Sequence, residues 1–149
     1  MMSRILPREI NPASWRGKLS IAWLVGCGAF IGSAARLLVT LTAYSWLSTD
    51  TTSVIWVWVP TLAVNITGSL ALGYLASRIA SSGQQGLWLL LGVGCLGSYT
   101  TFSGFALDIV LIAQHGSWLL MSIYGFSSVL LSIAAAGLGF YWASRHVRT

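Results

Sequence analysis

Four long apolar stretches alternate with short polar ones along the chain. They cover residues 19–44, 54–80, 87–113 and 118–144. Each is longer than the roughly 20 apolar residues that a helix needs to cross a bilayer. Pro60 falls in the first turns of the second stretch, where proline is tolerated. The pattern predicts an all-α membrane protein with four transmembrane helices per chain.

Few residues of the chain are charged. Charged residues make up 7% of the 149 residues, whereas a soluble domain has about 25%. Four spans with short loops use nearly the whole length and leave no room for a sizeable soluble domain. We therefore expect residues 1–17 to form a polar cytoplasmic lead and residues 18–149 to form one four-helix membrane domain.

The basic residues gather at one end of the predicted bundle. Four spans place both termini and the middle loop on one side of the membrane. The lysines and arginines of that side are Arg4, Arg8, Arg16, Lys18, Arg78, Arg145 and Arg148. Because positive charge is retained inside, this bias predicts cytoplasmic termini in a multi-pass protein of the cell inner, or plasma, membrane.

These basic residues at the ends of the spans account for the net charge of +5, so a nucleic-acid-binding function is not needed to explain it. A basic patch combined with a nucleic-acid-binding motif is missing from the sequence. The basic start followed by an apolar run mimics a signal peptide, but the run is too long and lacks a cleavage motif. Several tryptophans near the span ends suit an aromatic belt at the lipid headgroups. We expect membrane lipid, and no nucleic acid, among the partners.

The third apolar stretch contains a run of glycines and hydroxyl residues, from Gly97 to Phe105. Polar or irregular backbone at membrane depth survives only where it is buried in protein or lines a wet cavity. Glycines at 92, 94 and 97 allow the backbone to leave helical geometry, and carbonyls exposed at such a break can bind a cation. The run predicts a break in the third helix where an ion or small polar solute is handled.

Two polar stripes with helical spacing lie on other spans. They are Thr61, Asn65 and Ser69 on the second span, and Tyr124, Ser128 and Ser132 on the fourth. Either stripe alone is explained by hydrogen bonds between packed helices. Together with the third-span run they suggest a conduit whose neutral donors replace water around an anion without holding it tightly.

Phe102 and Phe105 share a helix face at i, i+3. Core packing explains such a pair, and the partly positive ring edges could also cradle a small anion.

Gly28 and Gly32 of the first span predict close helix packing. Arg36, one turn further along, is open to two interpretations: a functional cation within the membrane, or a side chain that snorkels to the headgroups.

Three other residues carry less information. Asp108 is the sole carboxylate within a span, and without a partner it is weak support for proton coupling. Cys27 and Cys95 have no metal-type spacing, and we expect small core residues without a disulfide.

These motifs together resemble the Fluc/CrcB family of small fluoride channels. The matching patterns are Gly26-x-Gly28-Ala29-x-x-Gly32-x-x-x-Arg36, Thr61-Leu62-x-x-Asn65-x-x-Gly68 and Gly97-x-x-Thr100-Thr101-Phe102-Ser103-x-Phe105. Their order and spacing are specific together, whereas each alone is weak. The resemblance covers nearly all of the chain after the lead.

The resemblance implies an antiparallel dimer of four-helix subunits with two fluoride pores. It implies that the pores are lined by Asn65, Phe102 and Phe105, with Thr61 and Ser103 among the pore residues, and that Tyr124, Ser128 and Ser132 continue the polar track. It also implies a structural sodium ion, held at the dimer centre by the backbone carbonyls of Gly97 and Thr100. Arg36 would sit in a vestibule or support the fold.

The sequence departs from the family pattern at three points. Gly104 replaces the usual threonine between the phenylalanines, and Asp108 stands where glutamate is common. The strong basic bias differs from the near-neutral bias of a chain that inserts both ways. The dimer partner is therefore a second copy or an oppositely oriented paralogue.

The sequence predicts a passive, fluoride-selective channel that exports the anion from the cytoplasm and reduces its toxicity. A small multidrug-type proton-coupled antiporter is the alternative, although its membrane-embedded acid is missing from the first span. An enzyme is not expected, because no nucleophile–base pair or metal cluster is placed for catalysis.

Overall fold

A computed structural model describes residues 15–47, 58–82 and 84–145 of the chain. Nearly all of these residues are helical. Four helical rods are long and apolar enough to cross a membrane, and the third is broken near its middle. The helices are α1 (Trp15–Leu47), α2 (Val59–Ser82), α3 (Gln85–Leu87), η3 (Trp88–Leu96), α4 (Gly97–Tyr99), α5 (Phe102–Gln114) and α6 (Trp118–Arg145). The predicted four-span fold with a break in the third helix is confirmed.

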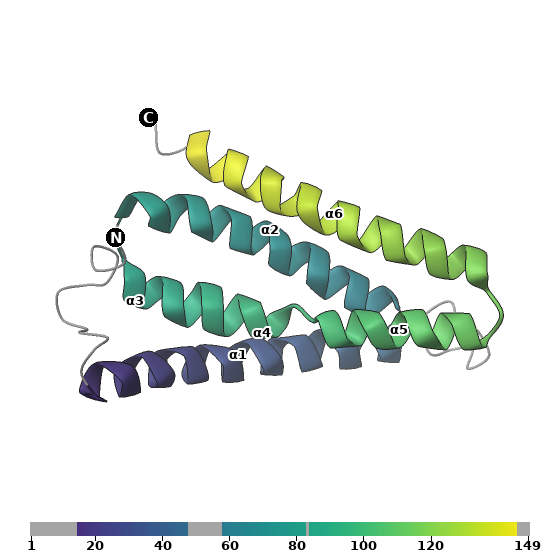
Figure 1. Ribbon diagram of the computed structural model, residues 1–149, viewed down its shortest axis with the longest axis horizontal. Coiled ribbons are helices and arrows are strands. Elements are labelled where there is room, and N and C mark those ends of the chain that lie inside the picture. The colour runs from purple at the N-terminus through teal and green to yellow at the C-terminus, as the bar shows by residue number, and fades with distance from the viewer. Residues whose placement is uncertain (1–14, 48–57, 83, 146–149) are drawn as a thin grey trace.

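The rods run alternately up and down the bundle (Figure 1). The beginnings of α1 and α3 lie at the same end as the last turns of α2 and α6. Lys18, Arg78 and Arg145 are therefore at one end, as the charge pattern predicts. The direction of the bundle in the membrane stays a prediction. Most of the predicted lead, residues 1–14, lies outside the described residues.

Two helix pairs are joined through glycines. A Cβ atom on Gly28 or Gly32 of α1 would overlap backbone atoms of Leu90 or Cys95 in η3. A Cβ on Gly73 of α2 or Gly139 of α6 would likewise overlap the facing backbone of the other helix. Since only glycine lets the backbones come this close, these contacts form two tight seams, α1 with η3 and α2 with α6. The packing role predicted for Gly28 and Gly32 is confirmed.

The first half of the third rod is wider than an α-helix. Over η3 the chain forms a π-helix of 9 residues, and the N–H of Gly97 bonds to the carbonyls of Gly92 and Gly94. A π-helix is rare because its hydrogen bonds span five residues rather than four. Here Gly92 and Gly94 are buried within it, and a Cβ on Gly94 would come within 2.6 Å of the Val25 carbonyl oxygen on α1.

Little of the chain is buried. The fully covered side chains include Val64, Ile112 and Tyr124, whereas large apolar residues such as Trp23 and Phe30 are exposed. Outward-facing apolar residues are expected where lipid or another subunit covers a helix. Cys27 is also exposed, so the prediction of a core residue is wrong at that position.

Candidate functional site

The third rod is interrupted at two threonines. α4 ends at Tyr99, and both Thr100 (φ −73°, ψ 156°) and Thr101 (φ −146°, ψ 122°) are extended before α5 begins at Phe102. The Thr101 hydroxyl accepts a hydrogen bond of 3.1 Å from the Gly104 N–H and so caps α5. Thr100 still donates a helical hydrogen bond to the Leu96 carbonyl, whereas the Thr101 backbone has left the helix and needs other partners.

Asn65 on α2 supplies those partners. Its Oδ1 accepts from the Thr101 N–H at 2.8 Å, and its Nδ2 donates to the Thr101 carbonyl at 3.0 Å. One side-chain amide thus pairs both backbone groups of an extended residue, as a neighbouring β-strand would. The sequence left open whether Asn65 makes hydrogen bonds between packed helices or lines a polar conduit. The structure shows hydrogen bonds between helices, and Asn65 also borders the groove described next.

A groove of about 300 Å³ opens beside the break. We call it the phenylalanine groove. It lies between α2, the break with the start of α5, and α6. Its walls are Asn65, Ser69, Leu72, Thr100, Thr101, Phe102, Phe105, Ser128, Val129, Ser132 and Ile133. The structure thus brings together Asn65, both phenylalanines and two hydroxyls of the fourth-span stripe.

Aromatic rings continue from this groove toward the start of α2. Ring centroids are 5.8 Å apart between Phe102 and Phe105, 5.5 Å between Phe105 and Tyr124, and 5.4 Å between Tyr124 and Trp58. All three pairs are tilted at 43–44°, an arrangement that brings ring edges toward neighbouring faces. We call these four side chains the aromatic run.

Tyr124 does not line the phenylalanine groove, whereas Ser128 and Ser132 of the same stripe do. It is 1% exposed, and its hydroxyl donates to Asp108 Oδ2 at 3.0 Å. It therefore stands behind Phe105 rather than in the groove wall. The pairing with Asp108 was not predicted from the sequence; the signal that could have found it is that a lone acid within a span needs a donor.

A second polar groove, of about 570 Å³, lies on the other side of the break between α1, α2 and α5. We call it the arginine groove, because half-buried Arg36 lines it. Two predicted pore residues, Thr61 and Ser103, line this groove and not the first. Thr101 borders both, so the break forms the wall between them.

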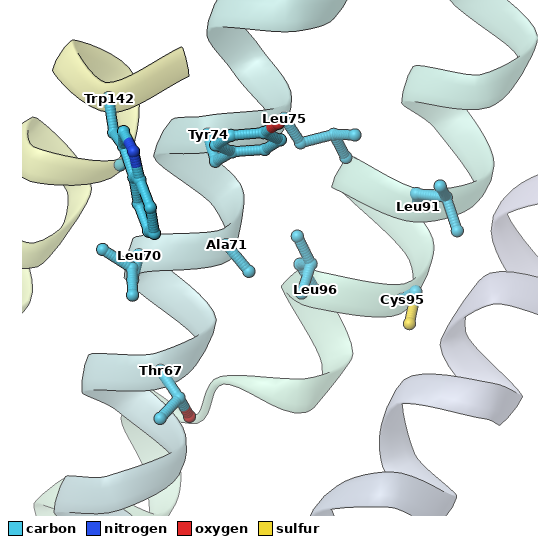
Figure 2. A pocket seen from close by; sticks show the side chains of 10 residues that line it. Thr67, Leu70, Ala71, Tyr74, Leu75, Leu91, Cys95, Leu96 and Trp142 are labelled. Atoms are coloured by element: carbon cyan, nitrogen blue, oxygen red, sulfur yellow. The ribbon is translucent and has the colours of Figure 1, made fainter.

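A third groove, of about 370 Å³, contrasts with these two (Figure 2). Leu70 and Tyr74 of α2, Leu96 of η3 and Trp142 of α6 line it, and nearly all of its surface is apolar. Thr67 lies at its end near the break, where its hydroxyl bonds to the Ala63 carbonyl at 2.7 Å and to the Tyr99 hydroxyl at 3.1 Å. This groove offers an ion no free donor from Thr67 and little other polarity.

The break also changes the hydrogen bonding at the end of α4. In a continuous helix the Thr101 N–H would bond to the Gly97 carbonyl, but here it bonds to Asn65. Thr100 bonds back to the Leu96 carbonyl through both its N–H and its hydroxyl, each at 3.1 Å. Carbonyls of the last turn of a helix are left for other partners, so those of Gly97 and Thr100 fit the predicted role of cation ligands.

Fold and grooves together define a class: a multi-pass membrane protein with a broken helix and neutral polar grooves, suited to passing a small ion. The chain belongs to the family described as "CrcB-like protein, Camphor Resistance (CrcB)", whose model matches residues 23–140.

Named relatives agree with this membership. A fluoride-specific ion channel FluC from Phenylobacterium zucineum is 37% identical over 125 residues, which cover 82% of this chain and 94% of that protein. A protein of the same name from Caulobacter sp. is 38% identical over 82% of this chain and 93% of its own length. Another, from Vibrio cholerae, is 32% identical over 83% of this chain and 94% of its own.

Proposed function

We propose that this chain forms a passive, fluoride-selective channel that lets fluoride leave the cytoplasm and so limits its toxicity. The relatives are named as fluoride-specific ion channels. Those names support a channel, and they support neither the antiporter alternative nor an enzyme. The observation that carries the proposal is the phenylalanine groove, where an amide, hydroxyls and aromatic edges meet at a helix break.

Fluoride is small and strongly hydrated, so it enters a narrow pore only where protein donors replace its water. In the phenylalanine groove, Ser69, Ser128 and Ser132 offer hydroxyls, and the tilted rings of Phe102 and Phe105 offer partly positive edges. None of these groups carries a full charge. They can therefore bind the anion weakly enough for it to leave, as conduction requires.

Asn65 has two tasks in this mechanism. Its hydrogen bonds to Thr101 fix the first turn of α5, and with it the position of Phe102. A primary amide has two N–H donors, and one of them is used at the Thr101 carbonyl. The second N–H is the group that Asn65 can present to a passing anion.

A single chain leaves the groove open. Phe102 is 80% exposed although it begins α5 in the middle of the third rod. A ring that lines a pore needs a second wall, which one chain does not provide. We infer that an antiparallel partner covers this face, either a second copy or an oppositely oriented paralogue, and that two pores result.

Sodium is part of the same proposal. The Gly97 and Thr100 carbonyls at the end of α4 fit a hard cation, because unwound backbone carbonyls and helix C-termini are typical sodium ligands in membrane proteins. A bound sodium ion would supply positive charge between two subunits and join them.

Thr100→Pro should disturb this helix end, and we expect it to abolish the sodium-dependent rise in thermal stability of the purified dimer. An unchanged response, compared with potassium, would count against the carbonyl site.

Arg36 has a role in electrostatics rather than in the narrow pore. It lines the arginine groove with Thr61 and Ser103, next to the start of α5. A cation in a concave polar groove attracts anions and raises their local concentration. We propose that this groove is a vestibule from which fluoride reaches the break.

The proposal is tested with purified protein in liposomes and a fluoride electrode. Vesicles loaded with potassium fluoride should release it rapidly when valinomycin carries the countercharge, whereas chloride-loaded vesicles should not discharge. The chain is reconstituted alone and with any paralogue encoded beside it. A complex of verified dimeric assembly that stays impermeable to fluoride would refute the function.

A further inference from the structure

Trp58 contains a buried donor that no part of the proposed pathway uses. Its indole Nε1 atom is buried and makes no hydrogen bond within the described part of the chain. Its backbone carbonyl is occupied normally, by the Leu62 N–H at 3.0 Å. Buried polar atoms nearly always have partners, and an exception points to a role in catalysis or binding, or to a bound water or ion.

The chemistry of the indole limits what that partner is. The Trp N–H only donates, so its partner must be an acceptor. The acceptor of the neighbouring aromatic cluster is the Asp108 carboxyl, which the Tyr124 hydroxyl already engages at 3.0 Å. Trp58 contacts the same tyrosine through its ring, at 5.4 Å between centroids. The Tyr124 hydroxyl is thus taken up by Asp108, while the indole donor has no hydrogen-bond partner among the described residues and stays available for a diffusible acceptor.

The position of Trp58 fits an ion leaving the aromatic run. The run starts at Phe102 beside the break, passes through Phe105 and Tyr124, and ends at Trp58. Trp58 immediately precedes α2, whose first turns lie at the opposite end of the bundle from the start of α1 (Figure 1). An anion that follows the ring edges away from the groove would meet the indole N–H last.

We propose that the Trp58 indole N–H is a fluoride-binding donor at the end of the pathway where α2 begins. This inference rests on the proposed function and adds a specific residue to it. An N–H donates a stronger hydrogen bond to an anion than to a neutral acceptor. The donor therefore lowers the barrier to fluoride at the point where the aromatic run ends.

The first test is a binding measurement. Protein labelled with ¹⁵N in its indole groups is titrated with sodium fluoride in nanodiscs, with sodium chloride at equal ionic strength as the reference. The Trp58 signal, assigned from its loss in Trp58→Phe, should shift downfield with fluoride and not with chloride. The signal of Trp118, which is 66% exposed at the start of α6, should not respond.

The second test is flux. Trp58→Phe keeps an aromatic ring against Tyr124 and removes only the donor, so the dimer should keep its elution volume and melting temperature. Loss of a charge-assisted hydrogen bond should slow fluoride efflux about tenfold. Trp118→Phe makes the same chemical change outside the pathway and should leave efflux unchanged.

The two measurements separate the outcomes. A fluoride-specific shift together with slower efflux supports the proposal. An indole signal that ignores fluoride overturns it, even if efflux falls, because Trp58 then acts through packing alone. Unchanged efflux in Trp58→Phe also overturns it. If the wild-type dimer passes no fluoride, the proposed function fails, and the indole titration still decides whether this donor binds the anion.

Discussion

At the seam between α1 and η3, Gly32 lies against the backbone of Cys95, with no space for a methyl group. At the break, Asn65 reaches the backbone of Thr101 with a side chain, through hydrogen bonds of 2.8 and 3.0 Å. Both contacts join one helix to the main chain of another. The first excludes everything but glycine, whereas the second leaves polar grooves on either side of Thr101.

The difference fits the proposal that one small bundle combines rigid helix contacts with a route for an ion. A seam gains its stability from dispersion between closely packed atoms and needs no polar partner. A break exposes backbone groups that must be satisfied at membrane depth, and we propose that the side chain that satisfies them also supplies a donor to a permeating ion. Substitutions at the seams should therefore affect folding first, and substitutions at the break should affect flux first.

The largest effect on folding is expected at the seam. Gly32→Ala adds a Cβ that would overlap the Cys95 carbonyl oxygen, so the helices must separate at a cost of about 1–3 kcal/mol or more. Gly26→Ala is the matched control, because its Cβ would meet nothing within 4 Å. We expect Gly32→Ala to reduce the yield of folded protein and its melting temperature, and Gly26→Ala to change neither. Equal behaviour of the two variants would contradict the seam.

Asn65→Leu should be the most damaging substitution at the break. It removes both hydrogen bonds to the part-buried Thr101 backbone, each of which is worth about 0.5–1.5 kcal/mol. We expect fluoride efflux to fall at least tenfold, with a lower melting temperature measured on the same preparation.

A control for that variant lies one turn further along α2. Ser69→Ala removes a hydroxyl from the phenylalanine groove without touching Thr101, so it should leave the melting temperature unchanged. If Asn65→Leu also leaves it unchanged, the amide does not hold the break.

The two phenylalanines should separate flux from stability. Phe102 is 80% exposed, whereas Phe105 is half-buried between Phe102 and Tyr124. Both Phe102→Ile and Phe105→Ile should slow efflux while the dimer still assembles. Phe105→Ile should lower the melting temperature more than Phe102→Ile, because Phe105 loses two ring contacts within the chain and Phe102 loses one, each worth about 0.5–1.5 kcal/mol. Wild-type efflux in both variants would remove the rings from the pore.

Much of this arrangement could be predicted from the sequence, because it depends on local patterns. Apolar length predicted the four spans, and the glycines and threonines of the third span predicted its break. Gly28 and Gly32 predicted a seam because only glycine permits such an approach. Each of these inferences uses the spacing of residues on a single helix.

What could not be predicted depends on how the helices are rotated and which residues meet across them. The stripe from Thr61 to Asn65 reads as one face, yet Asn65 borders one groove and Thr61 the other, because Thr101 comes between them. Tyr124 shares a face with Ser128, yet its hydroxyl turns to Asp108 on α5. Helical spacing shows which residues share a face of one helix, but it does not show which residues of other helices pack against that face.

The smallest effect is expected at the cap of α5, and it tests how precisely the break must be held. Thr101→Val keeps the shape of the side chain but removes the hydroxyl that accepts from the Gly104 N–H at 3.1 Å. Loss of an N-cap costs about 1 kcal/mol, while both Asn65 bonds to the Thr101 backbone can remain. We expect faster amide exchange in the first turn of α5 and efflux slowed by less than threefold. A larger loss of efflux with unchanged exchange would mean that the hydroxyl itself contacts fluoride, and Thr101 would then belong to the pore rather than to the wall between the two grooves.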